Sequence, residues 1–267
     1  PGAFRLEVRD IEFIHRAEDS GVRLVVGAGR GIGRALLEEQ MANPDVSRVI
    51  GTYRSQSSRE DLEPLSETWG DRLLLQPLDV TETASLQDFQ DFLQQQDEGI
   101  DLAIHAAGLL HADGIRPEKS IDQCDPRVLE TLFRVNSIGP LMVARAILAT
   151  MPRKRRFAFA AVSAMVGSIG DNRLGGWYGY RASKAALNQF MRTLAIECRH
   201  RYPHAVIVAA HPGTTDTELS RPFQGNIGPG KLYNPKQTAD RILRLASGLG
   251  TADSGHFFNW DGSEIPW

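Results

Sequence analysis

A tyrosine and a lysine four residues apart, Tyr180 and Lys184, are the side chains in this sequence best suited to move a proton. On a helix, residues at this spacing lie on one face, so the phenol and the ammonium would be neighbours. An ammonium beside a phenol favours the phenolate and lowers the pKa of the tyrosine. Such a phenol can pass a proton to or from a carbinol oxygen. The pair arises often by chance, so it needs a second signal elsewhere in the chain.

A glycine-rich turn far upstream supplies that signal. The apolar residues 24–26 predict a buried parallel strand, and residues 34–41 predict a helix that begins after the turn. Glycines permit a tight turn and close approach of a phosphate, and a helix N-terminus favours an anion. A glycine-rich surface loop is the alternative, which the flanking strand and helix disfavour. We expect a dinucleotide to contact Gly27, Gly29, Arg30, Gly31, Ile32 and Gly33.

Strands and helices are predicted to alternate along the rest of the chain. Further strands are expected at residues 46–53, 73–77, 101–105, 157–162 and 205–210, and helices at 83–96, 125–151 and 180–201. This alternation predicts an α/β fold, a Rossmann-type doubly wound parallel sheet, in a single domain over residues 21–267. Residues 1–20 are an N-terminal extension of unknown role, such as an added strand, an oligomer arm or an expression remnant.

Composition excludes several other classes of protein. The chain has 267 residues and a net charge of −3, which gives no reason to expect a nucleic-acid partner or an anionic membrane. We expect no apolar run long enough to cross a bilayer, no signal peptide in residues 1–19, and a cytoplasmic location. The two cysteines, Cys124 and Cys198, should stay reduced with structural roles, and no metal site is expected.

The glycine-rich turn followed later in the chain by the tyrosine–lysine pair resembles the motif order of a short-chain dehydrogenase/reductase. The C-terminal residues 255–267 and the long segment 170–178 before the tyrosine are similar to the C-factor and sniffer-like carbonyl reductase subgroup. The resemblance implies hydride transfer between a nicotinamide and the carbonyl carbon of a small molecule. It implies that Tyr180 is the general acid in reduction and that Lys184 also holds the nicotinamide ribose. It further implies that Asn136 completes a proton relay through water; a helix kink without catalytic role is the alternative.

The predicted cofactor is NADP. A carboxylate that would bind the ribose hydroxyls is missing at the tip of the second strand, where Arg54 stands instead. A guanidinium can hold a 2′-phosphate, and we expect Arg30 to point a second cation towards the same region. The family's Asn-Asn-Ala-Gly motif reads His105 to Gly108 here, so the side-chain bonds of both asparagines are lost. The resemblance implies further cofactor contacts at Asp79, Val80, Ala106, Ala107, Gly108, Pro212, Gly213 and Thr217.

The serine that the family uses to polarise the substrate carbonyl is missing. The position three residues before Gly167 is Ala164, and its neighbour Ser163 should point away from the cleft because strand side chains alternate. A bulge could re-aim Ser163, Ser168 could substitute, or the protein could be a weak or specialised enzyme or an engineered variant. We favour a rescuing serine and name Ser163 as the fourth catalytic candidate.

Two functions therefore compete. The first is an NADPH-dependent reductase of a small ketone, quinone or dicarbonyl, and the second is an NADP-binding regulatory or signalling protein with vestigial catalysis. The substrate wall is expected from residues 173–177 and 217–233, with Trp177, Tyr178 and Phe223 as aromatic members and the glycine- and proline-rich second stretch as a mobile lid. The resemblance implies a homodimer or homotetramer built on two long helices.

Overall fold

Seven parallel strands form one sheet, in the order β3-β2-β1-β4-β5-β6-β9, in the computed structural model, which describes residues 21–267. The strands are β1 (Gly21–Val26), β2 (Val46–Tyr53), β3 (Leu73–Pro77), β4 (Ile100–His105), β5 (Phe157–Val162), β6 (Ala205–His211) and β9 (Phe257–Asn259). Two short strands, β7 (Thr214–Thr215) and β8 (Leu232–Tyr233), pair separately. The predicted doubly wound Rossmann-type sheet is confirmed. The proposed N-terminal extension, residues 1–20, lies outside the described residues.

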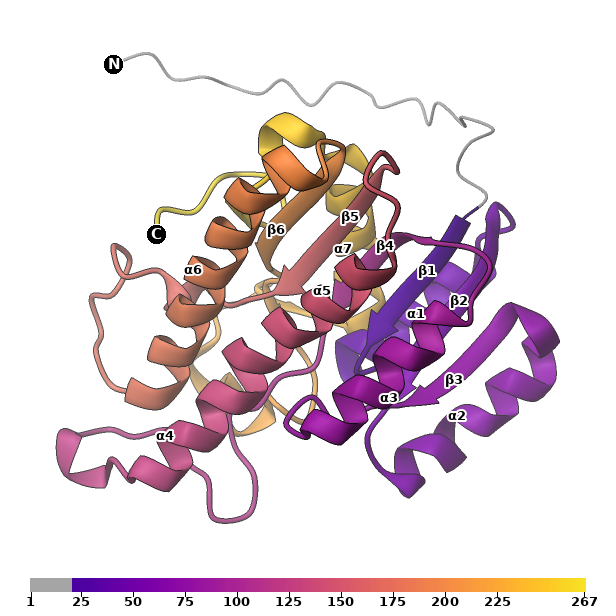
Figure 1. The fold of residues 1–267 in the computed structure, drawn as a ribbon. Coiled ribbons are helices and arrows are strands. Elements are labelled where there is room, and N and C mark those ends of the chain that lie inside the picture. The colour runs from indigo at the N-terminus through magenta and orange to yellow at the C-terminus, as the bar shows by residue number, and fades with distance from the viewer. Residues whose placement is uncertain (1–20) are drawn as a thin grey trace.

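Helices cover both faces of this sheet (Figure 1). They are α1 (Gly31–Ala42), α2 (Gln56–Trp69), α3 (Thr83–Gln94), α4 (Pro126–Phe133), α5 (Gly139–Thr150), α6 (Tyr178–Arg201) and α7 (Pro235–Gly248). Side chains of α3, α5 and α6 form one core layer with the sheet, and those of α1, α2 and α7 form the other. Because both faces are covered, β5 and β6 are almost continuous apolar runs.

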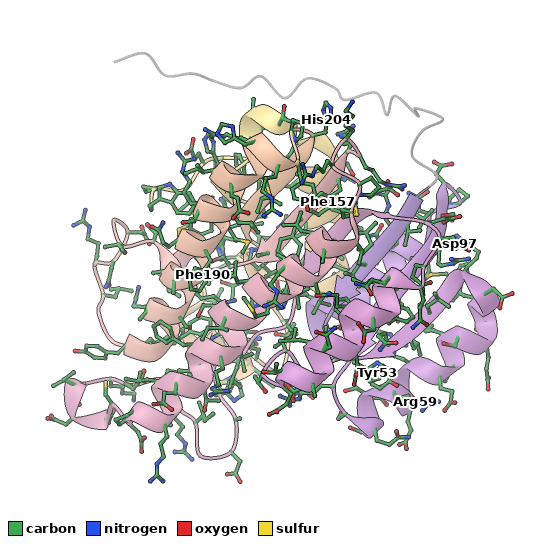
Figure 2. The ribbon with its side chains drawn as sticks, in the orientation of Figure 1. Tyr53, Arg59, Asp97, Phe157, Phe190 and His204 are labelled. Carbon is green, nitrogen blue, oxygen red and sulfur yellow. The ribbon has the colours of Figure 1, made fainter. Side chains whose placement is uncertain are left out.

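The segments expected to carry chemistry follow the carboxyl ends of the strands and so lie at one edge of the sheet. Figure 2 shows Tyr53, at the carboxyl end of β2, at the opposite end of the sheet from Phe157, which begins β5, and from His204, which precedes β6. The strand order reverses between β1 and β4, so the segments that follow these two strands diverge and open a crevice. The glycine turn after β1 and the loop after β4 border that crevice.

The chain from Pro126 to Thr150 is one long helix that contains a π-helical turn, Arg134–Ile138, between α4 and α5. By length and composition it could cross a membrane, so the expectation that no apolar run is long enough is wrong. More than half of its apolar stretch is buried, however, and it packs against α3 and α6. The helix is therefore part of the core of this domain.

Candidate active site

The glycine turn forms a cradle made of backbone. Gly27 and Gly31 have φ of 84° and 56°, in the left-handed region that glycine adopts without a steric penalty. A Cβ placed on Gly33 would lie 2.0 Å from the carbonyl oxygen of Gly27, so no other residue lets α1 begin this close to the turn. The turn thus presents the N-terminus of a 12-residue helix, with its free amides, to the crevice.

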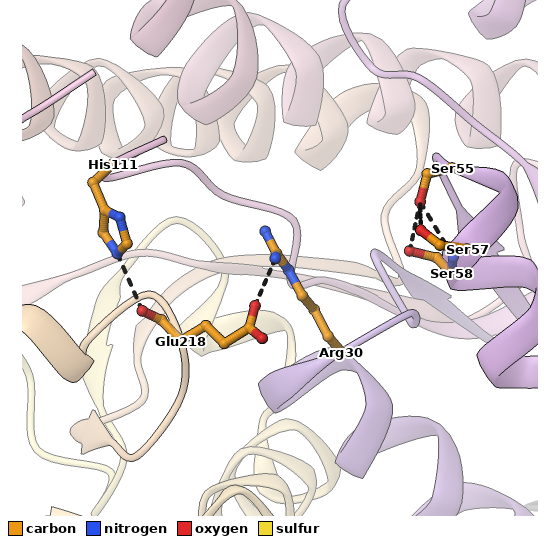
Figure 3. Close-up of polar contacts among 6 residues, drawn as sticks. All are labelled: Arg30, Ser55, Ser57, Ser58, His111 and Glu218. Atoms are coloured by element: carbon orange, nitrogen blue, oxygen red, sulfur yellow. Dashed lines mark hydrogen bonds and ion pairs between the residues drawn. The ribbon is translucent and has the colours of Figure 1, made fainter. Parts of the chain in front are cut away.

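A cluster of serine hydroxyls lies beside this turn, after Arg54. Ser55 caps the N-terminus of α2, and its hydroxyl lies 3.0 Å from the hydroxyls of both Ser57 and Ser58 (Figure 3). A Cβ on Gly29 would lie 2.8 Å from Ser58, so the cluster touches the glycine turn. These serines were not among the residues predicted from the sequence, although a serine N-cap followed by two more serines just after Arg54 is a recognisable signal.

Arg30 does not point towards this cluster, which corrects the expectation of a second cation there. Its guanidinium pairs with the carboxylate of Glu218 at 2.7 Å, and Figure 3 shows it extending away from the serines. His111 Nε2 lies 3.1 Å from the backbone oxygen of Glu218. Both members of the ion pair are exposed, so it contributes little to stability. It does link the glycine turn to the loop after β6.

Tyr180 and Lys184 lie one turn apart on α6, and both are buried. The Lys184 ammonium lies 5.9 Å from the centre of the Tyr180 ring and donates a hydrogen bond to the carbonyl oxygen of Val162 at 2.9 Å. Burial lowers the pKa of Lys184 to about 8. The tyrosine–lysine spacing predicts that the ammonium lowers the pKa of Tyr180, but in this structure burial dominates and raises the pKa of that phenol.

Asn136 lies in the π-helical turn with its side chain fully buried. Its amide oxygen accepts from the Leu109 N–H at 2.7 Å, and its amide nitrogen donates to the Leu109 oxygen at 2.7 Å and to Ser183 Oγ at 3.1 Å. Asn136 therefore ties the loop after β4 to α6. Pro140 has no N–H, so the backbone oxygen of Asn136, four residues earlier, has no α-helical partner.

The segment after β4 passes next to these residues. A Cβ on Gly108 would lie 3.5 Å from Asn136 Oδ1 and 3.6 Å from Lys184 Nζ, and Ala107 touches Gly27. His105, at the end of β4, is buried, and its Nε2 has no hydrogen-bond partner among the described residues. Burial, reinforced by the charge of Lys184, lowers the pKa of His105 to about 3. The segment thus joins the glycine turn to the catalytic candidates.

The adenine candidates have local partners. Asp79 Oδ1 accepts from the N–H and the hydroxyl of Thr81, at 2.9 and 2.7 Å, which shapes the turn after β3. Val80 is buried against Gly139, where a Cβ would lie 2.7 Å from the valine side chain. The turn that carries both residues is therefore fixed against the start of α5.

Neither candidate serine keeps its proton for a substrate. Ser163 Oγ donates to Asn188 Oδ1 at 2.6 Å, while Asn188 Nδ2 donates to the Gly167 oxygen at 3.4 Å. The pairing of β5 with β6 runs to its last pair without a register shift, so no bulge re-aims Ser163. Ser168 donates to the backbone oxygen of Pro266. The geometry therefore does not support the catalytic role expected for Ser163, or the substitution by Ser168.

Aromatic rings line the side of the site next to Tyr180. The Trp177 ring centre lies 6.2 Å from that of Tyr180 and 4.9 Å from that of Phe223, and Phe223 lies 5.7 Å from His111. These four rings are called the aromatic wall below. Tyr178, expected to belong to it, is 43% exposed on the first turn of α6 and makes no ring contact with them.

Trp177 is held in an unusual conformation by a buried carboxylate residue that the sequence analysis missed. With a φ of 53°, Trp177 is the one non-glycine residue in the left-handed region within residues 21–267. Its N–H donates to the backbone oxygen of Glu118 at 2.5 Å, and Glu118 Oε2 accepts from the Gly179 N–H at 3.2 Å. Strained residues gather at functional sites, and this one sets the entry into α6.

The loop after β6 closes the site from the other side. Gly213 packs against Tyr233 and Trp260, both 3.0 Å from where its Cβ would lie. Thr217 lies 3.2 Å from the Cβ position of Gly31. The predicted Pro212, Gly213 and Thr217 segment therefore reaches across to the glycine turn.

Comparison with known proteins agrees with this arrangement. Residues 22–227 match the family model described as short chain dehydrogenase. C-signal of Myxococcus xanthus is 35% identical over 136 residues, which cover 51% of this chain and 76% of that protein. A solved NADPH-bound carbonyl reductase from chicken fatty liver is 27% identical, with a TM-score of 0.78 over 94% of this chain and 97% of its own. Carbonyl reductase Sniffer of D. melanogaster, at 23% identity, shares the fold with a TM-score of 0.79 over 93% of this chain and 99% of its own.

Proposed function

The chain belongs to the short-chain dehydrogenase family and is an oxidoreductase, and from this we propose that it reduces a small carbonyl compound with NADPH. One observation carries the proposal. Buried Tyr180 and Lys184 share a face of α6, beside Asn136, at the same edge of the sheet as the glycine turn. A proton donor and a dinucleotide cradle at one edge are what a carbonyl reductase requires.

The residues of the crevice fit a dinucleotide. Because Gly33 has no Cβ to collide with the Gly27 oxygen, the glycine turn lies directly against the N-terminus of α1, and that helix end suits the pyrophosphate. Arg54 and the serine hydroxyls beside Gly29 would hold the 2′-phosphate that distinguishes NADP from NAD. When bound, NADPH supplies the hydride and is oxidised to NADP⁺. The other proposed contacts are Asp79 and Val80 at the adenine, Ala106 to Gly108 and Lys184 at the nicotinamide ribose, and Pro212, Gly213 and Thr217 at the nicotinamide.

Tyr180 would act as the general acid. As the carbonyl carbon gains a hydride, negative charge develops on its oxygen, and the phenol gives that oxygen its proton. With a pKa of about 8, the buried Lys184 is mostly an ammonium at neutral pH, and its charge would favour the resulting phenolate. The backbone oxygen of Asn136 would hold a water through which Tyr180 is reprotonated.

A second function, an NADP-binding regulator with vestigial catalysis, is favoured by Ala164 and by the committed protons of Ser163 and Ser168. Such a protein would keep the cradle and lose turnover. The two functions therefore differ in whether Tyr180 is needed.

We also propose that the protein assembles into a homodimer or homotetramer in the cytoplasm. Ile138, in the π-helical turn, and Ile196, on α6, are 43% and 47% exposed, and both could meet a second copy. Cys124 and Cys198 are free thiols, as expected for a reducing compartment. Size-exclusion chromatography with light scattering would report the assembly.

The test is nicotinamide absorbance over time with NADPH and then NADH, for the native protein and for Tyr180→Phe. We expect oxidation of NADPH in the presence of a carbonyl compound, and a fall in kcat of about 10²- to 10⁴-fold in Tyr180→Phe with NADPH affinity retained. Equal, minimal turnover by both proteins, with tight NADPH binding, would instead support the regulator.

A further inference from the structure

We propose that Glu118, a buried residue of the loop between β4 and α4, is a positioning residue for the general acid. It fixes the start of α6, and through that start it fixes the direction of the Tyr180 phenol. The inference rests on the proposed function, because it assigns Glu118 a part in the same reaction. Glu118 acts through the backbone of Trp177 and Gly179, and not on the substrate itself.

Glu118 holds the first turn of α6 with both its backbone and its side chain. Its backbone oxygen accepts from the N–H of Trp177, the residue that caps the helix, at 2.5 Å. Its Oε2 accepts from the N–H of Gly179 at 3.2 Å, one residue before Tyr180. The first amides of a helix have no acceptor within that helix. Glu118 therefore supplies two of the partners that α6 needs at its start.

The backbone that leads into α6 has a conformation that needs external support. Gly175, Gly176 and Trp177 have φ of 64°, 65° and 53°, which makes three consecutive residues in the left-handed region. Glycine adopts this region freely, whereas the Cβ of a tryptophan carries a steric penalty there. The Glu118 backbone oxygen lies 3.3 Å from where a Cβ on Gly176 would be, so Glu118 touches this segment at successive residues. A strained conformation persists only where its surroundings hold it, and Glu118 is part of that hold.

One oxygen of the Glu118 carboxyl group is unpaired, which lowers the stability of the fold. Glu118 is 2% exposed, and its Oε1 has no hydrogen-bond partner among residues 21–267. A Cβ on Gly179 would lie 3.0 Å from that oxygen, and 2.6 and 2.8 Å from the side chains of Leu132 and Leu129 on α4. A buried polar atom beside apolar side chains costs free energy unless it is paired. A residue that breaks this rule points to a role in function.

The position of Trp177 reaches the Tyr180 phenol by two routes. Along the chain, the Arg181 N–H donates to the Trp177 oxygen at 2.9 Å, which closes the turn that contains Tyr180. Through space, the Trp177 ring meets the Tyr180 ring at 6.2 Å and an interplanar angle of 71°. Release of Trp177 would therefore let both the helix start and the aromatic wall move. A misplacement of about 1 Å in a reacting group can slow a reaction about 10²-fold.

The experiment replaces Glu118 with methionine, which has a similar length but no oxygen to accept a hydrogen bond. Turnover is measured as NADPH oxidation with acetophenone, menadione and 1-phenylpropane-1,2-dione, one compound from each predicted class. We expect Glu118→Met to lower kcat by about 10- to 100-fold while the Kd for NADPH is retained. The unfolding midpoint, followed by circular dichroism, should fall by no more than about 4 °C, because loss of the unpaired oxygen offsets loss of the bond to Gly179.

Three further variants separate positioning from a general effect on the fold. Glu118→Gln keeps an oxygen that accepts from Gly179, so its kcat should stay within about threefold of the native value. Glu130→Met makes the same exchange at an exposed position on α4 and should change neither kcat nor the unfolding midpoint. In a Tyr180→Phe background, Glu118→Met should cause no further fall in kcat, because the phenol through which Glu118 acts is already absent.

The failures are distinguishable. Native kcat in Glu118→Met, with a clear loss in Tyr180→Phe, would overturn the inference and leave the proposed function standing. Failure of Glu118→Met to fold, or an equal fall in kcat with and without the Tyr180 phenol, would show that Glu118 supports the domain as a whole, and would also overturn the inference. No NADPH oxidation by the native protein with any of the three compounds would overturn both the inference and the proposed function.

Discussion

The glycine turn and the carbonyl site lie at the same edge of the sheet but are built in opposite ways. The turn is defined by missing side chains, since its shape exists because Gly33 has no Cβ to meet the Gly27 oxygen. The proposed carbonyl site is defined by the side chains present, namely Tyr180, Lys184 and Asn136.

This difference decides how each region tolerates change. Almost any substitution in the turn introduces atoms where the backbone already lies, so the turn is either intact or lost. At the proposed carbonyl site we expect a change of one polar group to alter the chemistry without moving the backbone, because the replaced atoms belong to a side chain. We therefore propose that the turn sets whether a cofactor binds, and that the side chains around Tyr180 set which substrate reacts.

The largest effect that tests this contrast is expected from Gly33→Ala. The new Cβ would lie 2.0 Å from the Gly27 oxygen, so the backbone must shift. We expect NADPH binding to be lost, measured by fluorescence titration, and the unfolding free energy to fall by about 1–3 kcal/mol. Gly248→Ala, at the end of α7 with open space around it, is the matched control and should change neither. Normal NADPH affinity in Gly33→Ala would contradict the claim that the glycine turn cannot accept a side chain.

A smaller effect is expected at His105, between the two regions. Its pKa is lowered by burial from 6.5 to about 3, so between these values the unfolded chain binds a proton that the folded chain does not. The stability from this group is fully present above pH 6.5 and is lost as the pH falls towards 3.

His105→Asn should therefore reduce the acid sensitivity of the fold, by about 1–3 kcal/mol near pH 4. Urea unfolding at about pH 7 and about pH 4 measures it. His211, whose pKa burial lowers to about 4, remains as a second acid-sensitive group, so the variant should retain part of the dependence. An unchanged pH dependence would mean that His105 is not neutral and buried in solution.

The smallest effects are expected from two arginines, Arg30 in the glycine turn and Arg54 after β2. Arg54→Ala should lower the ratio of kcat/KM with NADPH to that with NADH by about tenfold, because one exposed charge-assisted contact to the 2′-phosphate is lost. Arg30→Ala should lower it by less than about threefold, because Arg30 pairs with Glu218 instead. A larger effect at Arg30 than at Arg54 would show that the ion pair between Arg30 and Glu218 opens when the cofactor binds.

The sequence predicted the sheet, the glycine turn and the tyrosine–lysine helix well because each depends on local or periodic properties. Apolar strands must be buried, glycines mark where backbones approach, and residues four apart share a helix face.

Side-chain direction was harder to predict because it depends on partners far away in the sequence. The side chain of Arg30 is oriented by Glu218, that of Ser163 by Asn188, and that of Ser168 by Pro266. Nothing in the sequence around these three residues indicates such partners. Burial also reversed the expected shift of the Tyr180 pKa. The expectation considered Tyr180 and Lys184 on an isolated helix, where the phenol is not removed from water. Roles that rest on direction therefore needed the structure.

The π-helical turn at Arg134–Ile138 has a consequence for the whole long helix. It adds one residue within a turn, so everything after it is rotated by roughly 100° about the axis relative to an uninterrupted α-helix. This phase change lets α4 face α6 while α5 faces α3. Deleting one residue from the turn would remove the phase change, so that α4 and α5 could no longer both meet their neighbours. The π-helical turn thus fixes the rotation of α4 relative to α5, and the length of this segment is as constrained as its composition.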